Sequence, residues 1–430
     1  MNPRYERWRW VTFGITWLIY ASFYLTRQAF AVAKDPLQHD PKVALSRSDL
    51  GLMDVAYSIT YMLGLFIFGA AGDRFGPRRI LLAGMMLSII AATACGFSTA
   101  FWAFLIFSVL QGIAQSTGWT NVNKTMASWF SLKERGRVLG WWCTNYPFGA
   151  SVAFVLAGTM ITWFSASPMA PYWPAAFFGS SVVLGGVMVL AWLFLRNRPE
   201  DVGLPSIETY HGEKESLIDE DEVQAPVPEG SWKVIREVIG SPTIWMLAIA
   251  YFSIKLVRYG FYFWGATYAA ESLGTTPKFS TITVAMFPLG GMVGVVGAGY
   301  ISDKLYQSRR APWAVISLLI LAALMFVGYR PIHNIWVMGT FFFLAGIFLF
   351  GPDSMTSATA SVDFGTKRGA GTATGVVNGF GSIGQILAGY LPGVITSENN
   401  WTPLFIVFQV GLFASAVVLL PLWNRKPPQR

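Results

Sequence analysis

The sequence is poor in charged residues, in cysteine and in histidine. Charged residues make up 13% of the 430 residues, whereas hydrophobic residues make up 53%. A soluble domain carries roughly 25% charged residues, so this composition excludes a soluble globular fold. The two cysteines, Cys95 and Cys143, lie in apolar stretches and predict neither a disulfide framework nor a metal site. We therefore expect the chain to lie in a lipid bilayer.

Apolar stretches long enough to cross a membrane follow one another along the chain. The first begins after Arg4, Arg7 and Arg9, and no small-residue cleavage site ends it, so we expect a retained helix and not a signal peptide. A helix of roughly 20 apolar residues spans the hydrocarbon core. The pattern predicts an all-α membrane protein with twelve transmembrane helices, near residues 10–33, 50–71, 80–98, 101–127, 138–164, 172–195, 242–270, 281–301, 312–328, 335–358, 370–395 and 402–423.

The basic residues are distributed unevenly between the two sides of these spans. Alternate connections, together with both chain ends, hold most of the 31 lysines and arginines. The connections on the other side hold only Lys34, Lys42, Arg47, Lys278 and Arg330. Because cytoplasmic loops are enriched in basic residues, we expect both termini to be cytoplasmic. The net charge of +8 is then a topology signal and does not indicate nucleic-acid binding.

One long polar connection divides the spans into two sets of six. Residues 196–240 contain the acidic run 219–222, which we interpret as part of a solvated loop. The sequence predicts an N-terminal six-helix bundle over 1–195, a cytoplasmic linker loop over 196–240 and a C-terminal six-helix bundle over 241–430.

The two halves carry the same features at nearly the same offset. Gly69-x-x-x-Asp73-Arg74 follows the second span, and Gly299-x-x-x-Asp303-Lys304 follows the eighth, about 230 residues later. Arg27 in the first span and Arg258 in the seventh are separated by a similar distance. Parallel repeats of this kind occur in transporters, whose substrate site lies near the bilayer midplane.

Four cations lie inside the predicted spans: Arg27, Lys124, Lys255 and Arg258. A charge at the bilayer centre costs at least about 2.5–3.5 kcal/mol, so such residues face a cavity or a partner. Asp54 and Asp353 lie toward span ends, and we expect neither to neutralise both arginines. We favour an anion site over pairing of each arginine with a distant acid. Lys124 lies near a span end, where snorkelling to the interface and a role in substrate passage both remain open.

Tyrosines recur with these cations at helical spacing. The sets that share a helix face are Tyr20, Tyr24 and Arg27; Tyr251, Lys255, Arg258 and Tyr262; and Tyr57 and Tyr61. Aromatic packing alone would explain any one tyrosine, but the combination favours a polar cavity. Each of two guanidinium groups can donate a pair of parallel hydrogen bonds to the oxygens of a phosphate group. A phosphate ester or inorganic phosphate therefore fits better than a monocarboxylate.

The segment Gly69-Ala-Ala-Gly-Asp73-Arg74-Phe-Gly76-Pro-Arg78-Arg79 resembles the loop signature of the major facilitator superfamily. The resemblance covers the whole chain and implies the major facilitator fold, with two pseudo-symmetric six-helix bundles. We interpret the loop and its repeat as a gating and packing element, although its arginines could also serve topology alone. Its residues are Gly69, Asp73, Arg74, Arg78, Asp303 and Lys304.

Other segments resemble the organophosphate:phosphate antiporter family. They are Tyr24-Leu25-Thr26-Arg27-Gln28-x-Phe30, Gln115-x-x-Gly118-Trp119 with Lys124, Trp129-Phe130-x-x-Lys133-Glu134-Arg135-Gly136, Arg198-Pro199-Glu200-Asp201-Val202-Gly203-Leu204-Pro205, Lys255-Leu-Val-Arg258-Tyr259-Gly260 and Gly351-Pro352. The resemblance implies that Arg27 and Arg258 hold the phosphoryl group, and that a phosphate ester is exchanged for inorganic phosphate.

The chain departs from the glycerol-phosphate members of that family around this clamp. Gln28 and Leu65 stand where those members have lysine, Asn145 where they have histidine, and Lys255 where they have tyrosine. A hexose phosphate, a phosphorylated three-carbon acid or a phosphonate is therefore as good a candidate as glycerol 3-phosphate. The predicted substrate-binding residues are Arg27, Arg258, Lys255, Tyr24, Tyr61, Trp119, Asn145, Tyr259, Tyr20 and Tyr262.

We expect a secondary transporter that works by rocker-switch alternating access in a bacterial inner membrane, as a monomer and without cofactor or metal. Its partners would be a small phosphate ester, inorganic phosphate and the lipid bilayer. Two alternatives remain: a proton-coupled carrier of carboxylates or sugar acids, and a membrane sensor of sugar phosphates with little transport. An enzyme is the least favoured class, because no nucleophile–base pair or phosphate loop is present. The organic substrate and the direction of transport stay open.

Overall fold

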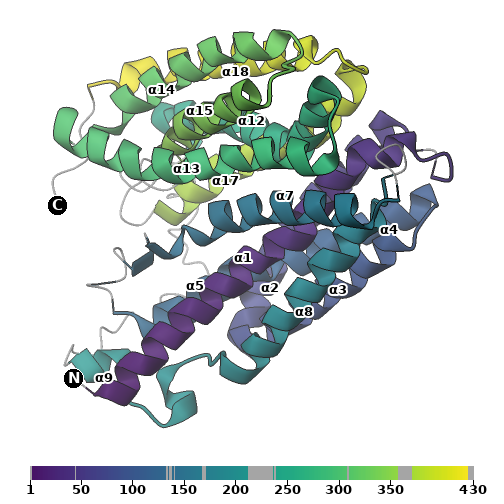
Figure 1. Cartoon of the computed structure of the whole chain (residues 1–430). Helices are drawn as coiled ribbons and strands as arrows, with labels where there is room; N and C mark the ends of the chain where they lie inside the picture. Colours follow the sequence, from purple (N-terminus) through teal and green to yellow (C-terminus); the bar gives the residue numbers. More distant parts are fainter. Residues whose placement is uncertain are drawn as a thin grey trace. The chain divides into compact units, whose positions relative to one another are not determined.

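The protein is described by a computed structural model covering residues 2–43, 45–131, 134, 138–139, 141–166, 171–211, 236, 239–307, 309–356 and 370–424 (Figure 1). These residues are almost entirely helical, and their only β-type pairing is an isolated bridge between Ser397 and Asn400. The predicted all-α class is confirmed.

The N-terminal half contains, within its described residues, seven long helical segments and two short ones. They are α1 (Pro3–His39), α2 (Arg47–Phe75), α3 (Pro77–Gly96), α4 (Phe101–Ser116), α5 (Gly118–Trp129), α7 (Asn145–Phe164), α8 (Pro174–Phe194), the 3₁₀ turn η1 (Pro199–Val202) and α9 (Ile207–His211). Proline occupies the first turn of α3 and α8, where its missing N–H costs nothing. A break at Thr117 separates α4 from α5, so the predicted span 101–127 consists of two helical segments.

The described part of the C-terminal half contains six long helices and two short 3₁₀ turns. They are α12 (Pro242–Leu273), α13 (Pro277–Leu305), α14 (Arg310–Leu324), η2 (Met325–Tyr329), α15 (Ile335–Ser354), α17 (Ala370–Ile395), α18 (Thr402–Leu419) and η4 (Leu420–Leu422). Residues 366–369, which follow the predicted tenth span, lie outside the described residues.

Ten helical segments in the described part of the chain are long and apolar enough to cross a membrane, counting α4 with α5, α14 with η2 and α18 with η4 as one each. The helices α1 and α17 have ample length, with 37 and 26 residues, but their composition is more polar. Arg27 and Lys34 lie within α1, and α17 is rich in glycine. The two predicted spans with the weakest apolar character are thus the first and the eleventh.

The chain folds into two compact units. The first consists of Met1–Ala33 and Ile59–Pro226, and the second of Lys34–Ser58 and Val227–Arg430. We call Lys34–Ser58, which joins the end of α1 to the start of α2, the hairpin end. It belongs to the unit of the C-terminal helices. The predicted bundle boundaries at residues 195 and 241 stay a prediction.

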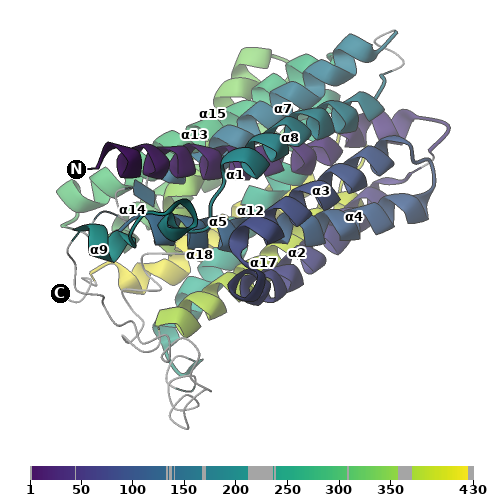
Figure 2. The ribbon, with the colours of Figure 1, turned by 90° about the horizontal axis from the view of Figure 1, so that it is seen from below.

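In the first unit, α3 lies beside both α4 and α8, and α7 lies beside α8 (Figure 2). Gly149 of α7 packs on the backbone of Ala21 in α1, where any side chain would overlap the Ala21 carbonyl. The start of α1 is fastened to α9, because Tyr5 and Tyr210 stack with ring centroids 3.9 Å apart. Small residues such as Gly149 let membrane helices approach each other closely.

In the second unit, α13 packs on α15 and α12 on α17. Side chains at Gly290 and Gly346 would overlap the carbonyl oxygens of Phe343 and Phe287, so α13 and α15 touch backbone to backbone. Gly384 of α17 lies equally close to the Phe252 carbonyl of α12. These contacts fix the depth and rotation of α12 and α15, which carry the charged groups described below.

Candidate substrate-binding site

Arg27 lies half-buried on α1 in the first unit. Its Nη2 donates a hydrogen bond to Gln115 Oε1 at 3.2 Å. Its guanidinium carbon lies 4.5 Å from the centre of the Tyr24 ring and 5.1 Å from the centre of the Tyr61 ring. The structure thus brings together Arg27, Tyr24 and Tyr61, three of the predicted site residues. Cation–π contacts of this kind stabilise a desolvated guanidinium group.

Gln115 is held in place by its own hydrogen bonds. Its Nε2 donates to the Phe23 carbonyl oxygen at 2.9 Å, to Thr26 Oγ1 at 3.0 Å and to Ser88 Oγ at 3.3 Å. The side-chain oxygen is therefore fixed toward Arg27. Gln115 was not among the predicted site residues, although a glutamine inside an apolar span is a signal that points to such a role.

Tyr20 of α1, about two turns before Arg27, and Trp119 of α5 belong to an aromatic cluster. The Tyr20 ring lies 5.2 Å from Trp119, 6.0 Å from Trp142 and 5.9 Å from Tyr24 between centroids. Gly118 makes room for this cluster, because a side chain there would press on the Tyr20 ring. The cluster connects Tyr20 to Arg27 through Tyr24, and it includes Trp142, which the sequence did not single out.

Asn145 begins α7 and is fully buried. Neither its amide nitrogen nor its amide oxygen has a hydrogen-bond partner among the described residues. Asn145 precedes Gly149 by one helical turn, so it lies on the face of α7 that packs on α1. A buried amide without partners is costly in a structural role, and it is a natural group for binding a polar ligand.

Arg258 on α12 is 8% exposed and forms an ion pair in the second unit. Its Nη1 donates to Asp353 Oδ2 of α15 at 2.8 Å. Its guanidinium carbon lies 4.7 Å from the Phe350 ring centre and 5.7 Å from those of Tyr259 and Tyr262. The preference for an anion site over pairing with a distant acid was thus wrong in one respect, because Arg258 does pair with Asp353.

Lys255 lies one turn before Arg258 and is half-buried. Its Nζ lies 5.4 Å from the Tyr251 ring centre and 5.6 Å from that of Tyr259. Gly381 of α17 faces this group, because a side chain there would meet Tyr251 and the Lys255 Cδ. The structure therefore brings Lys255 together with Tyr251, as the helical spacing predicts, and also with Tyr259.

The predicted loop element is held by contacts within the first unit. Lys124 Nζ donates to Asp73 Oδ1 at 2.6 Å and also to the Gly69 carbonyl oxygen. Lys124 thus engages the acid at the end of α2, which neither proposed role of Lys124 anticipated. Gly72 lies against Asn121, so this glycine is needed for the close approach of α2 and α5.

The basic residues of the loop element behave differently from one another. Arg78 donates from Nη2 to the Trp192 carbonyl oxygen at 2.5 Å, and its backbone N–H donates to Asn197 Oδ1 at 2.8 Å. Arg74 contacts the Phe75 ring. In the C-terminal repeat, Lys304 Nζ donates to the Tyr300 hydroxyl at 2.6 Å. The side chain of Asp303 lies outside the described residues.

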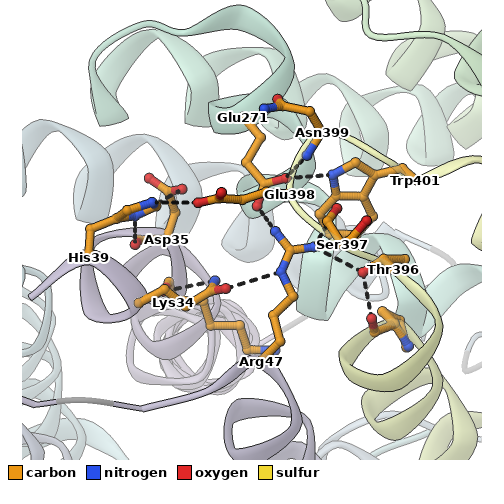
Figure 3. Close-up of polar contacts among 12 residues, drawn as sticks. Lys34, Asp35, His39, Arg47, Glu271, Thr396, Ser397, Glu398, Asn399 and Trp401 are labelled. Atoms are coloured by element: carbon orange, nitrogen blue, oxygen red, sulfur yellow. Dashed lines mark hydrogen bonds and ion pairs between the residues drawn. The ribbon is translucent and has the colours of Figure 1, made fainter.

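A second polar cluster surrounds Arg47 at the hairpin end (Figure 3). Arg47 donates to Gln38 Oε1 at 3.1 Å and to Thr396 Oγ1 at 3.0 Å, and it forms an ion pair with Glu271 of α12. The second oxygen of Glu271 accepts hydrogen bonds from the Asn399 backbone at 3.1 Å and the Trp401 ring nitrogen at 2.9 Å. Glu271 thus ties α12, the hairpin end and the α17–α18 connection together.

Lys34 and Asp54 form a buried ion pair beside this cluster. Lys34 is completely buried and Asp54 is 4% exposed. Lys34 Nζ also lies 3.9 Å from the Trp264 ring centre. Lys34 was expected in a polar connection, and that expectation is wrong because α1 continues to His39 and carries Lys34 inward.

His39 ends α1 beyond the predicted span. Its Nδ1 bonds to the Asp35 carbonyl oxygen at 2.9 Å, and its Nε2 lies 3.1 Å from Glu398 Oε1 (Figure 3). These two contacts raise the pKa of His39, although partial burial acts in the opposite direction. Because the pKa is raised, the contact with Glu398 is strongest in acid and weakens as the pH rises through that pKa.

Two helical units that bury cations among tyrosine rings define a multi-pass membrane protein of the transporter class. The family model of the Major Facilitator Superfamily matches residues 16–389. The membrane sensor protein UhpC of Escherichia coli K12 is 31% identical over 438 residues, covering 100% of this chain and 95% of that protein. The chain belongs to the Major Facilitator Superfamily, and its resemblance to the organophosphate:phosphate antiporter family is confirmed.

Another relative and a solved structure agree with this assignment. A probable hexose phosphate transport protein of Chlamydia trachomatis serovar D is 28% identical over 435 residues, covering 99% of this chain and 93% of that protein. A bacterial homologue of the human lysosomal transporter Spinster, in an inward-facing and unoccupied conformation, has a TM-score of 0.72 and 16% identity, covering 98% of this chain and 96% of that one. That likeness shows the fold alone.

Proposed function

We propose that this protein is a secondary transporter that exchanges a phosphate ester for inorganic phosphate. The observation that carries the proposal is the pair of buried or half-buried arginines, Arg27 and Arg258, one in the first helix of each half. Each guanidinium contacts two tyrosine rings, which add hydroxyl groups to a low-dielectric setting. Arginine binds phosphate through paired hydrogen bonds, and these are strong away from water. The named activity of the Chlamydia relative supports a sugar phosphate as one class of substrate.

The residues around the arginines would read the organic part of the substrate. Asn145 is the strongest candidate, because its buried amide has no partner in the described structure. Trp119 and Tyr20 would offer an aromatic surface, and Lys255 with Tyr259 would add a cation and a hydroxyl. The roles of Tyr24, Tyr61 and Tyr262 would be to hold the two guanidinium groups in place.

Transport would proceed by alternating access of the rocker-switch type, without chemical conversion of the substrate. We propose that the protein is a monomer in a bacterial inner membrane with both termini in the cytoplasm. The excess of basic residues in alternate connections supports this orientation.

Phosphate counterflow tests the proposal. The purified chain would be reconstituted into liposomes loaded with inorganic phosphate, and uptake of radiolabelled phosphate would be followed with and without the internal load. We expect uptake that internal phosphate accelerates and that particular phosphate esters inhibit. Uptake driven only by a pH gradient and indifferent to phosphate would contradict the proposal and favour a carboxylate carrier.

A sensor of sugar phosphates is the second candidate, because UhpC is named a membrane sensor protein. Such a protein would bind a phosphate ester with little flux. Binding of glucose 6-phosphate to the purified chain, measured by calorimetry, together with the absence of counterflow in the same preparation, would favour the sensor.

A further inference from the structure

The carboxylate of Asp353 pairs with the guanidinium group of Arg258, which the proposed function assigns to the substrate phosphate. Asp353 Oδ2 accepts from Arg258 Nη1 at 2.8 Å, and the two side chains are 5% and 10% exposed. Asp353 Oδ1 is buried and has no hydrogen-bond partner among the described residues. A pair that served only the fold would be expected to satisfy both oxygens, because an unsatisfied buried acceptor is costly.

The helices hold this pair in a fixed geometry. Asp353 follows Pro352 near the end of α15, and Gly346 on the same helix packs against the Phe287 carbonyl of α13. Phe350 lies under the Arg258 guanidinium, one turn before Asp353. Asp353 thus reaches Arg258 from a rigid element, so its carboxylate competes with any other anion for the same donors.

We propose that Asp353 is an internal counter-ion that takes the place of the substrate phosphate on Arg258 when the carrier is empty. The inference rests on the proposed function and deepens it. Its first consequence is that a phosphate group must either displace the Asp353 carboxylate from Arg258 or share Arg258 with it. The carboxylate therefore weakens substrate binding. Its second consequence is that the empty carrier has a neutral pair at Arg258, which lets it change conformation without substrate. Transport is then a mixture of exchange and net flux.

The test compares Asp353→Asn with Glu271→Gln in the full-length protein. Both substitutions remove a 5%-exposed carboxylate charge that pairs with an arginine of the same unit, and both keep an oxygen acceptor. Inorganic phosphate is the probe, and two quantities are measured. One is its dissociation constant, by calorimetry in detergent; the other is the ratio of net phosphate efflux into phosphate-free medium to phosphate exchange, in liposomes.

Asp353→Asn is expected to tighten phosphate binding about tenfold, which corresponds to about 1.4 kcal/mol, and to abolish net efflux while exchange persists. Glu271→Gln is expected to leave the dissociation constant within about twofold of the original protein, which is less than about 0.5 kcal/mol. Unchanged affinity and an unchanged flux ratio in Asp353→Asn would overturn the proposal. Loss of binding in Asp353→Asn that Asp353→Glu restores would also overturn it, because Asp353 would then only position Arg258.

Two further outcomes keep the inference separate from the proposed function. If the unmodified protein neither binds nor exchanges phosphate, the proposed function fails, and the counter-ion role falls with it. If Asp353→Asn does not fold, the unmodified protein still decides: measurable net efflux of phosphate supports the inference, and strict exchange without net efflux contradicts it.

Discussion

The two arginines at equivalent positions of the repeat differ in their described contacts. The described contacts of Arg27 include an amide oxygen and the rings of Tyr24 and Tyr61. Arg258 instead contacts a carboxylate as well as aromatic rings. The internal repeat therefore preserves the position of the cation, but the described contacts of the two arginines differ, and substitutions of the two arginines should have different side effects.

Lysine at either arginine position should keep the charge but lose the forked hydrogen bonds. We expect Arg27→Lys and Arg258→Lys to reduce phosphate counterflow at least about tenfold, since a hydrogen bond to a charged group contributes roughly 1.5–3 kcal/mol. Arg330→Lys, in an exposed connection, is the matched control and should exchange phosphate normally. Counterflow near the original rate in either test variant would remove the arginine from the proposed phosphate site.

Asn145 and Asn121 offer a second comparison, because both are fully buried in the first unit. Asn121 donates to the carbonyl oxygens of Phe68 and Thr117, whereas the Asn145 amide has no partner among the described residues. Asn121→Ala should lower the free energy of unfolding by about 1 kcal/mol, whereas Asn145→Ala should leave it unchanged or raise it. Asn145→Ala should instead weaken inhibition of counterflow by phosphate esters. A stability loss at Asn145 equal to that at Asn121 would indicate a structural role, and melting curves would reveal it.

At the scale of the elements, the glycines between α13 and α15 set the depth of Asp353. Gly346→Ala should overlap the Phe287 carbonyl and cost about 1–3 kcal/mol of stability through overpacking. Gly297→Ala, on α13, has open space around it and should be neutral or slightly stabilising, because alanine favours helices. Thermal unfolding in detergent measures both. Equal melting temperatures would show that the backbone contact can relax.

The hairpin end carries a charge pair that is fully desolvated. Asp54→Asn should lower the free energy of unfolding by about 3–5 kcal/mol, because it leaves the buried Lys34 ammonium without its carboxylate. The double variant Lys34→Met with Asp54→Leu should recover most of that loss, since apolar pairs often replace buried ion pairs without penalty. Failure of the double variant to recover stability, in the same melting assay, would show that the pair contributes more than charge neutralisation.

At the scale of the whole molecule, the asymmetry of basic residues predicts which connections face the cytoplasm. A cysteine placed at Arg330 should react with a membrane-impermeant maleimide added to intact cells, after Cys95 and Cys143 have been replaced. A cysteine placed at Lys304 should react only after the cells are permeabilised. The reverse pattern would invert the proposed orientation.

Much of this architecture could be predicted from the sequence. Hydropathy placed the helices, and helical spacing placed Tyr24 beside Arg27 and Tyr251 beside Lys255. These features depend on residues that are close together in the sequence, so they can be read from it directly. The predicted helix positions place Arg27 and Arg258 inside membrane spans, so both could be identified as site candidates before any of their contacts was known.

The partners of the buried charges could not be predicted in the same way. Asp353 reaches Arg258 because α15 and α12 are held at one depth by tertiary contacts, and no spacing in the sequence reports that depth. Lys34 was assigned to a connection because hydropathy ends the first span at the first run of polar residues, while α1 continues to His39. The fixed oxygen of Gln115 depends on Ser88 and Thr26 from other parts of the fold.

The hairpin end also bears on how the protein is made. Lys34 and Asp54 are synthesised early, but Trp264 and Glu271, which they and Arg47 contact, follow about 230 residues later. At roughly 5–20 residues per second, the ribosome needs on the order of 10–50 s to supply them. During that interval Lys34 and Asp54 can neutralise each other, because both lie in the hairpin end. A chain that starts after residue 58 could not complete the second unit. In such a chain Glu271 would lack Arg47, and Trp264 would lack Lys34.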